Sequence, residues 1–195
     1  MNKIKLIVGL LNPGAKYYLT RHNAGAWYIN LLVKKYKINI KKNINFFGSI
    51  SSLRINNNNI YILLPNTFIN LSGMSVKNVS NFYNIFPEEI LIAHDDLDLP
   101  PGIIKFKQGG GHGGHNGLKD IIGKLRNNKN FYRLRIGIGH PGNRDKVNQF
   151  VLSKPDNDEK ELINLALHEA VICTEILFKI GYVHALNRLN SFKIK

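Results

Sequence analysis

Apolar and polar residues alternate along the chain with two different periods. Short apolar runs bounded by turn residues predict strands at about 3–9, 47–54, 60–64, 90–94, 103–107 and 132–139. Apolar residues at helical spacing predict helices at about 23–37, 72–84, 117–126 and 157–180, with a shorter helix near 183–190. Because strands alternate with helices, the pattern predicts an α/β fold whose sheet is covered on both faces.

The pattern indicates one domain. The chain has 195 residues and shows neither an internal repeat nor a linker, so we expect a single domain over residues 1–195. The asparagine-rich stretch 56–59 lies between two predicted strands, a position typical of a hairpin turn rather than of a ligand site.

Three features of the sequence indicate where in the cell the protein is found. No apolar run approaches the roughly 18 residues needed to cross a membrane. The N-terminal segment 1–14 reaches Asn-Pro-Gly early and lacks a small-residue cleavage site, so we interpret it as a first strand rather than a signal peptide. The single cysteine, Cys173, cannot form an internal disulfide. We therefore expect a cytoplasmic protein without membrane contact.

The formal net charge of +14 is unevenly distributed. Residues 1–87 contain no acidic residue, 88–98 contain five acidic residues and no basic one, and 99–154 are again strongly basic. The excess of lysine over arginine also fits drift in an AT-rich genome, so the total charge alone says little. Its distribution favours a polyanionic partner that approaches one acidic site.

Three polar residues lie next to predicted strands or helices, where open α/β folds collect their functional groups. Asn12 ends the first strand, although Asn-Pro-Gly is also a common turn. His22 precedes a helix and has the titration range of a general base, although a lone histidine can simply pack and Asn23 can serve as an N-cap. Asp95 follows the apolar run 90–93, a position suited to an acid that orients such a base.

Metal binding is disfavoured at both clusters of potential ligands. Asp96 and Asp98 are interpreted as solvated turn residues, and the acidic island lacks the alternation, central Gly and closing Glu of a calcium loop. His112 and His115 lie in a glycine-rich segment without further Cys or acidic ligands nearby, which disfavours zinc. We therefore expect no metal.

The segment 108–117 is the most unusual part of the chain, because its many glycines allow a ligand or another backbone to approach closely. It satisfies G-x-G-x-x-G through Gly109, Gly111 and Gly114. A dinucleotide site would then need an acidic residue about 20 positions later, and none lies within 121–144. A nicotinamide cofactor is therefore disfavoured, whereas a loop that fits a nucleotide-bearing polymer or a peptide backbone remains open.

Neither potential protein nucleophile is convincing. The run Asn70-Leu71-Ser72-Gly73 would resemble a nucleophile elbow only with Gly in place of Asn70. Cys173 lies within an apolar helical pattern, where a buried thiol is the default. By elimination, we expect water to be the nucleophile of a hydrolytic reaction.

Several long motifs carry a resemblance to a known family. They occur in the order Asn12-Pro13-Gly14, Arg21-His22-Asn23, Thr67 to Gly73, His94 to Pro100, Gly109 to Lys119 and Arg133 to Gly142. With these motifs at consistent separations, the chain closely resembles the bacterial peptidyl-tRNA hydrolases. The resemblance spans nearly the whole chain and thins after about Pro155.

The resemblance implies a monomeric enzyme, without a cofactor, whose mixed twisted sheet is wrapped by helices. Such enzymes hydrolyse the ester between peptide and tRNA in peptidyl-tRNA, and so recycle tRNA from peptides released prematurely by ribosomes. Carried over by motif, His22 is the general base, Asp95 orients it and Asn12 holds the region of the ester. Asn70 and Asn116 bind the peptide backbone near the ester.

The resemblance also implies an RNA-binding side. Lys107, Arg135 and Arg144 match positions that face RNA phosphates, whereas the remaining substrate-side residues are Tyr17, Phe68 and His115. Two departures from the family pattern bear on substrate preference rather than activity: Ile69 stands where Met is usual, and Arg144 where Lys is common.

The main alternative is a non-catalytic RNA-binding protein on the same fold, as in an organellar RNA-splicing relative of the family. The presence of both His22 and Asp95 favours the enzyme.

Overall fold

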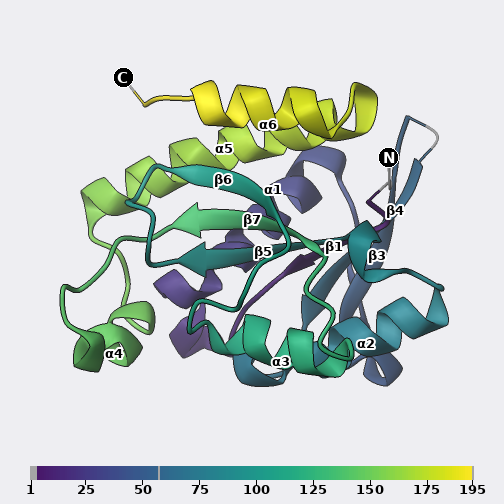
Figure 1. The fold of residues 1–195 in the computed structure, drawn as a ribbon, viewed down its shortest axis with the longest axis horizontal. Coiled ribbons are helices and arrows are strands. Elements are labelled where there is room, and N and C mark those ends of the chain that lie inside the picture. Colours follow the sequence, from purple (N-terminus) through teal and green to yellow (C-terminus); the bar gives the residue numbers. More distant parts are fainter. Residues whose placement is uncertain (1–3, 57, 195) are drawn as a thin grey trace.

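The computed structural model describes residues 4–56 and 58–194, and its centre is a seven-stranded mixed sheet of order β2-β3-β4-β1-β5-β7-β6 (Figure 1). The strands are β1 (Leu6–Gly9), β2 (Lys41–Asn43), β3 (Gly48–Ile55), β4 (Asn58–Pro65), β5 (Ile90–Asp96), β6 (Ile104–Gln108) and β7 (Tyr132–Gly137). The four central strands β4, β1, β5 and β7 run parallel, whereas β2, β3 and β6 pair antiparallel at the two sides.

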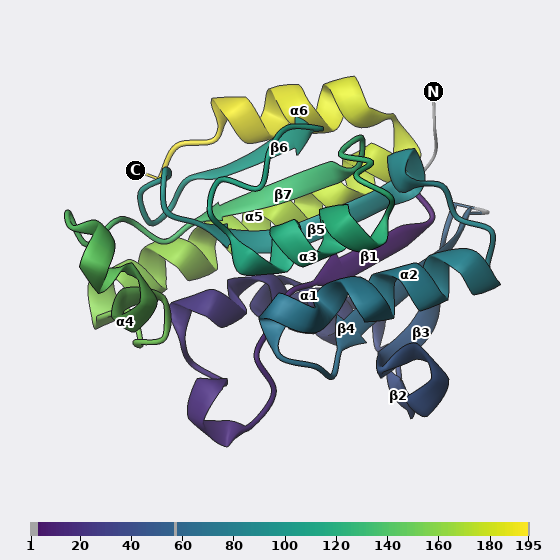
Figure 2. The same ribbon diagram turned by 60° about the horizontal axis from the view of Figure 1, so that its bottom comes forward.

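Helices cover both faces of this sheet, as the strand and helix pattern predicts (Figures 1 and 2). The α-helices are α1 (Ala24–Tyr36), α2 (Ser72–Phe82), α3 (Asn116–Lys124), α4 (Val147–Val151), α5 (Asn157–Lys179) and α6 (Tyr182–Ser191). Helices α1, α5 and α6 contribute to one apolar core, and α2 and α3 to a second core on the opposite face. The central strands are apolar on both sides because each side faces one of these cores.

Two glycines bring the start of α1 against the sheet. A Cβ atom on Gly25 would lie 2.2 Å from the carbonyl oxygen of Ala93 in β5, and one on Gly9 would lie 2.4 Å from the Ile29 side chain. Only residues without a side chain allow this close approach. The contact fixes the segment just before α1, which contains His22, beside the carboxyl ends of β1 and β5.

The sequence pattern missed one strand and one α-helix. Strand β2 has the polar sequence Lys-Lys-Asn at the edge of the sheet, and α4 has five residues, so neither has enough apolar positions to show a period. The predicted hairpin at 56–59 is confirmed, because Ile55 pairs with Asn58 across β3 and β4. Its turn is shorter than predicted, since Asn58 and Asn59 belong to β4; Asn56 has a φ of 45°, and Asn57 lies outside the described residues.

Within the described part of the chain, no helix is long and apolar enough to cross a membrane.

Candidate active site

Parallel strands β1 and β5 are neighbours, so the segments after their carboxyl ends meet at one edge of the sheet. Asn12 follows β1, and Asp95 lies near the end of β5. His22 comes from a short 3₁₀ helix, η2 (Arg21–Asn23), directly before α1. The fold therefore gathers at one place the three residues to which the sequence assigns the chemistry.

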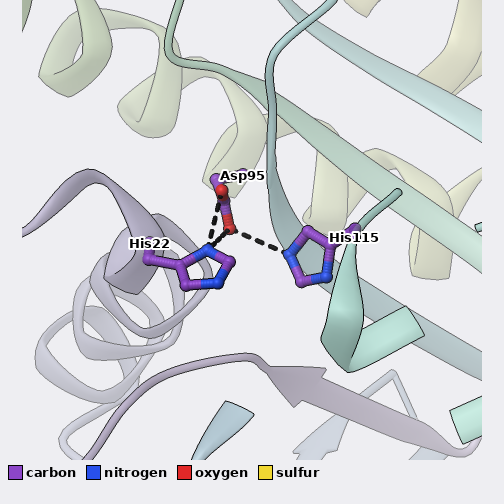
Figure 3. A group of neighbouring side chains, drawn as sticks. All are labelled: His22, Asp95 and His115. Carbon is purple, nitrogen blue, oxygen red and sulfur yellow. Dashed lines mark hydrogen bonds and ion pairs between the residues drawn. The ribbon is translucent and has the colours of Figure 1, made fainter. Parts of the chain in front are cut away.

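His22 and Asp95 form a buried hydrogen-bonded pair (Figure 3). Nδ1 of His22 lies 2.9 Å from each carboxylate oxygen of Asp95. Burial alone would lower the pKa of His22, but the charge of Asp95 and the hydrogen bond to it outweigh burial and raise this pKa above its ordinary value of 6.5. Burial opposes ionisation of Asp95, yet His22 and His115 hold the pKa of this carboxyl well below its usual range. Asp95 is therefore ionised, as an orienting acid must be.

His115 also contacts this carboxylate. Its Nε2 lies 3.0 Å from Oδ1 of Asp95, and its ring centroid lies 5.0 Å from that of His22. Figure 3 shows the two rings directed toward the carboxylate from opposite sides. The sequence predicts His115 as a substrate-side residue; the structure gives it a direct contact with Asp95 that sequence spacing did not reveal.

A third histidine, His94, lies in the same cluster and was not among the predicted site residues. It is buried, its ring is 5.1 Å from that of His115, and its Nδ1 donates to the backbone oxygen of Asp95 at 2.7 Å. Burial is the largest influence on this ring and lowers the pKa of His94 to about 3. His94 thus stays neutral and supports the backbone of Asp95.

Asn12 is fixed through both its side chain and its backbone. Its Oδ1 accepts from the backbone N–H of Ile69 at 2.9 Å, which leaves Nδ2 to donate elsewhere. The side chain of Asn23 holds the Asn12 backbone at both polar groups, at 2.8 Å and 3.0 Å. Asn23 does occupy the N-cap position of α1, but its side chain makes no capping bond there, because it is engaged with Asn12.

The predicted peptide-binding asparagines are exposed. Asn70 and Asn116 line an open groove of about 500 Å³ together with the charged side chains of α3. Phe68, which is 52% exposed, packs edge to face against Tyr17 with ring centroids 6.2 Å apart. Within the described residues, none of these four predicted substrate-side side chains hydrogen-bonds to the buried pair.

Asn116 also lines a separate cavity of about 70 Å³. Its lining includes His22, Asp95 and His115, two glycines of the loop after β6 (Gly113 and Gly114), and three residues of α4. This short helix, which the sequence pattern missed, therefore forms one wall of the site.

Arg21 connects η2 to the segment after α4. Its guanidinium donates to Ser153 at 2.7 Å and to the backbone oxygen of Lys154 at 2.8 Å, forms an ion pair with Glu159, and lies over the ring of Phe150. The residue next to His22 is thus tied to chain segments more than a hundred positions away. Only its place in the Arg-His-Asn motif singled it out in the sequence.

The three predicted phosphate-binding cations have different surroundings. Lys107 and Arg144 are exposed, and within 4–56 and 58–194 neither has an acidic partner. Arg135 is paired with Asp96 through Nε at 2.6 Å and approaches Asp98 at 3.6 Å. Asp96 is therefore not the solvated turn residue that the sequence indicated, because β5 and β7 bring it beside Arg135.

The glycine loop after β6 does not have the context of a dinucleotide site. Strand β6 is an antiparallel edge strand, whereas the G-x-G-x-x-G motif binds pyrophosphate after a parallel strand in a βαβ unit. The loop is instead held by Arg133, whose guanidinium donates to the backbone oxygens of Gly110 and Gly111.

Two further features bear on nucleophilic and metal chemistry. Cys173 is buried, and burial raises the pKa of its thiol to about 12. Within the described residues, His22, Asp95 and His115 place ligand-type atoms within 4.8 Å of one another. The nitrogens that face Asp95 each have a carboxylate acceptor, so we assign this cluster as a hydrogen-bond network.

Comparisons with known proteins identify the family. The sequence model of the family described as "Peptidyl-tRNA hydrolase" matches residues 6–195. The peptidyl-tRNA hydrolase of Proteus mirabilis is 58% identical over 99% of this chain and 100% of its own length, and that of Haemophilus ducreyi is 57% identical over the same shares. The crystal structure of the Acinetobacter baumannii peptidyl-tRNA hydrolase superposes with a TM-score of 0.95 at 47% identity, over 99% of this chain and 97% of that one. The chain belongs to the peptidyl-tRNA hydrolase family.

Proposed function

We propose that the chain hydrolyses the ester between peptide and tRNA in peptidyl-tRNA, with a water activated by His22. The observation that carries this proposal is the buried His22–Asp95 pair beside the fixed amide of Asn12. In a bacterial cytoplasm this reaction would recycle tRNA from peptides released prematurely. No second function has a comparable observation in its favour.

The hydrogen bond to Asp95 sets the tautomer of His22. Because the carboxylate only accepts, Nδ1 of neutral His22 carries the proton and Nε2 has a free lone pair. Nε2 can then take a proton from water as the water oxygen attacks the ester carbonyl carbon. Asp95 stabilises the imidazolium that forms, without itself becoming protonated.

Collapse of the tetrahedral intermediate completes the reaction. The bond between the carbonyl carbon and the ribose oxygen breaks, and that oxygen takes the proton from Nε2 of His22, which restores the neutral base. The products are a peptide with a free carboxylate and a tRNA with a free hydroxyl group. Nδ2 of Asn12 is suited to donate to the carbonyl oxygen while negative charge develops there.

The substrate extends in two directions from the ester. Asn70 and Asn116, with Tyr17 and Phe68 nearby, are proposed to hold the peptide in the open groove. Lys107 and Arg144 are proposed to contact RNA phosphates, which such cations position without reading sequence. Arg135 belongs to this proposal as well, although its pairing with Asp96 reduces the charge it can offer. We expect the monomer to be the active form.

The test is release of peptide from a labelled peptidyl-tRNA by wild-type protein and by His22→Ala. We expect the variant to lose a factor of about 10² to 10⁴ in kcat, the usual contribution of a general base, while its affinity for tRNA changes little. His168→Ala is the matched control, because His168 is exposed on α5. Wild-type protein that binds peptidyl-tRNA without releasing peptide would favour the non-catalytic alternative.

A further inference from the structure

Both ring nitrogens of His115 are engaged, and their partners define where its proton lies. Nδ1 faces the backbone N–H groups of Gly117 at 3.1 Å and Leu118 at 3.3 Å. Backbone N–H groups only donate, so Nδ1 must accept and carries no proton. The proton of the neutral ring is therefore on Nε2, which donates to Oδ1 of Asp95 at 3.0 Å.

We propose that His115 is a positioning residue that joins the start of α3 to the catalytic pair and, as a second donor to Asp95, limits how strongly that carboxylate holds a proton on His22. This inference rests on the proposed function, in which neutral His22 is the base. It assigns His115 a role distinct from contact with the substrate.

The first part of the role concerns α3. His115 occupies the N-cap position of this helix, where Ser, Thr, Asp and Asn are the preferred residues. Any of these would accept the same backbone N–H groups. Unlike these four side chains, an imidazole has a second ring nitrogen that can donate in another direction. In His115 this nitrogen, Nε2, donates to Oδ1 of Asp95. The next residue is Asn116, so one side chain sets where the proposed peptide-binding amide lies relative to the catalytic pair.

The second part concerns the basicity of His22. Asp95 stabilises the protonated form of His22, and an N–H dipole from His115 on the shared Oδ1 opposes that stabilisation. Without this donor, His22 would hold its proton more tightly and the free base would exist only at higher pH. His115 thus helps to keep His22 neutral while Asp95 still orients it.

The other ionisable groups around the cluster do not substitute for this donor. His94 stays neutral and its Nδ1 donates to the backbone oxygen of Asp95 rather than to the carboxylate. Asp96 is engaged by Arg135 on the neighbouring strand β7. Within the described residues, the side chains that donate to the Asp95 carboxylate are those of His22 and His115.

Two substitutions separate the two parts of the role. In His115→Asn the amide oxygen replaces Nδ1 as the helix cap, but nothing replaces Nε2. In His115→Gln the longer side chain can place an amide N–H where Nε2 was, but no acceptor remains at the capping position. A matched control is His112→Asn, since His112 is exposed in the same loop and its Nδ1 accepts from Gly114, two residues later.

The measurements are the pH profile of kcat/KM, the pKa of His22 from NMR titration, and the melting temperature. We expect His115→Asn to raise the pKa of His22 by about half a unit to one unit, which corresponds to the loss of one neutral hydrogen bond. The acid limb of the pH profile should move to higher pH by the same amount. We expect His115→Gln to leave the acid limb in place, to lower the melting temperature by about 2–4 °C through loss of the cap, and to raise KM as Asn116 becomes less fixed. His112→Asn should match wild type.

The proposal is wrong if His115→Asn leaves the pKa of His22 unchanged or lowers it, or if both His115 variants move the acid limb equally. The NMR titration does not require turnover. Failure of the wild-type protein to release peptide would therefore refute the proposed function, whereas an unmoved His22 titration would refute this inference.

Discussion

The groups proposed for the chemistry and those proposed to bind the substrate differ in how they are held. Asn12, His22 and Asp95 are 6%, 9% and 3% exposed, and hydrogen bonds to other parts of the chain fix each of them. Asn70, Asn116 and Arg144 are exposed, and in the described part of the chain no side-chain hydrogen bond fixes them.

Fixed and exposed groups should affect different kinetic constants. Groups that are fixed before the substrate arrives need no reorganisation when charge develops, so their loss should mainly reduce kcat. Exposed groups become ordered when they meet the substrate, and their loss should mainly raise KM. The proposed function thus divides the site into a buried region that would act on the reacting atoms and an exposed region that would act on affinity.

The largest effect should follow from Asp95→Asn. An asparagine amide can donate to Nδ1 of His22 and so favour the tautomer with its proton on Nε2, where it cannot act as a base. We expect kcat to fall by about 10² to 10⁴ with little change in tRNA affinity, measured in single-turnover release assays.

Asp98→Asn is the control for this substitution, because the Asp98 side chain is 83% exposed. It should retain most of the activity. Turnover by Asp95→Asn close to that of the control would contradict the division between a buried catalytic region and an exposed binding region.

The next effect is that of pH on the wild-type enzyme. Although burial lowers the pKa of His22, the charge of Asp95 raises it above 6.5, so the fraction of neutral base should begin to fall already above pH 6.5. We expect kcat/KM to fall about tenfold for each unit of pH below this pKa, because one proton blocks the base. An acid limb that stays flat down to pH 5 would exclude His22 as the base.

The residues proposed for catalysis were easier to predict than their surroundings. Strands β1 and β5 begin with strongly apolar runs, so the sequence indicated both strands and the polar residues near their carboxyl ends, Asn12 and Asp95. The motifs of the family resemblance added the pairing of His22 with Asp95. The direction of the Asn12 amide was not predictable, because it depends on the backbone N–H of Ile69, 57 positions later.

The roles of His115 and Arg135 were hidden for the same reason. The contact of His115 with Asp95 depends on the path of the glycine loop, which has no periodic pattern. The pairing of Arg135 with Asp96 depends on the register of β5 and β7, in which His94 lies opposite Arg135. Side-chain partners that come from different strands are set by the tertiary structure, and local sequence patterns do not contain them.

A smaller effect is expected in the exposed region. Arg144→Ala should raise KM for peptidyl-tRNA with a smaller change in kcat. It should also make the slope of the logarithm of the tRNA binding constant against the logarithm of the salt concentration shallower by roughly 0.7 to 0.9, which is the contribution of one phosphate contact. On a minimal peptidyl ester of adenosine it should behave almost like wild type. Equal losses on both substrates would show that Arg144 does not act through the RNA.

Arg135→Ala is a useful second variant for this comparison. Removal of the Arg135 side chain would leave Asp96, next to Asp95 in β5, without this ion-pair partner. We therefore expect Arg135→Ala to lose activity on both substrates, in contrast to Arg144→Ala. Identical behaviour of the two variants would mean that the Asp96 pairing has no influence on the chemistry.

The smallest effect should be that of a chelator. The nitrogens of His22 and His115 that face Asp95 are accounted for as hydrogen-bond donors, so we expect kcat/KM to be unchanged by EDTA after dialysis. The minimal adenosine ester is the right substrate, because chelation also removes Mg²⁺ that folded tRNA requires. A loss of activity on full peptidyl-tRNA alone would reflect a change in the folding of the RNA. If activity on the minimal ester is lost and a single metal ion restores it, the His22–Asp95–His115 cluster is a metal site rather than a hydrogen-bond network. The water would then be activated by the metal rather than by His22.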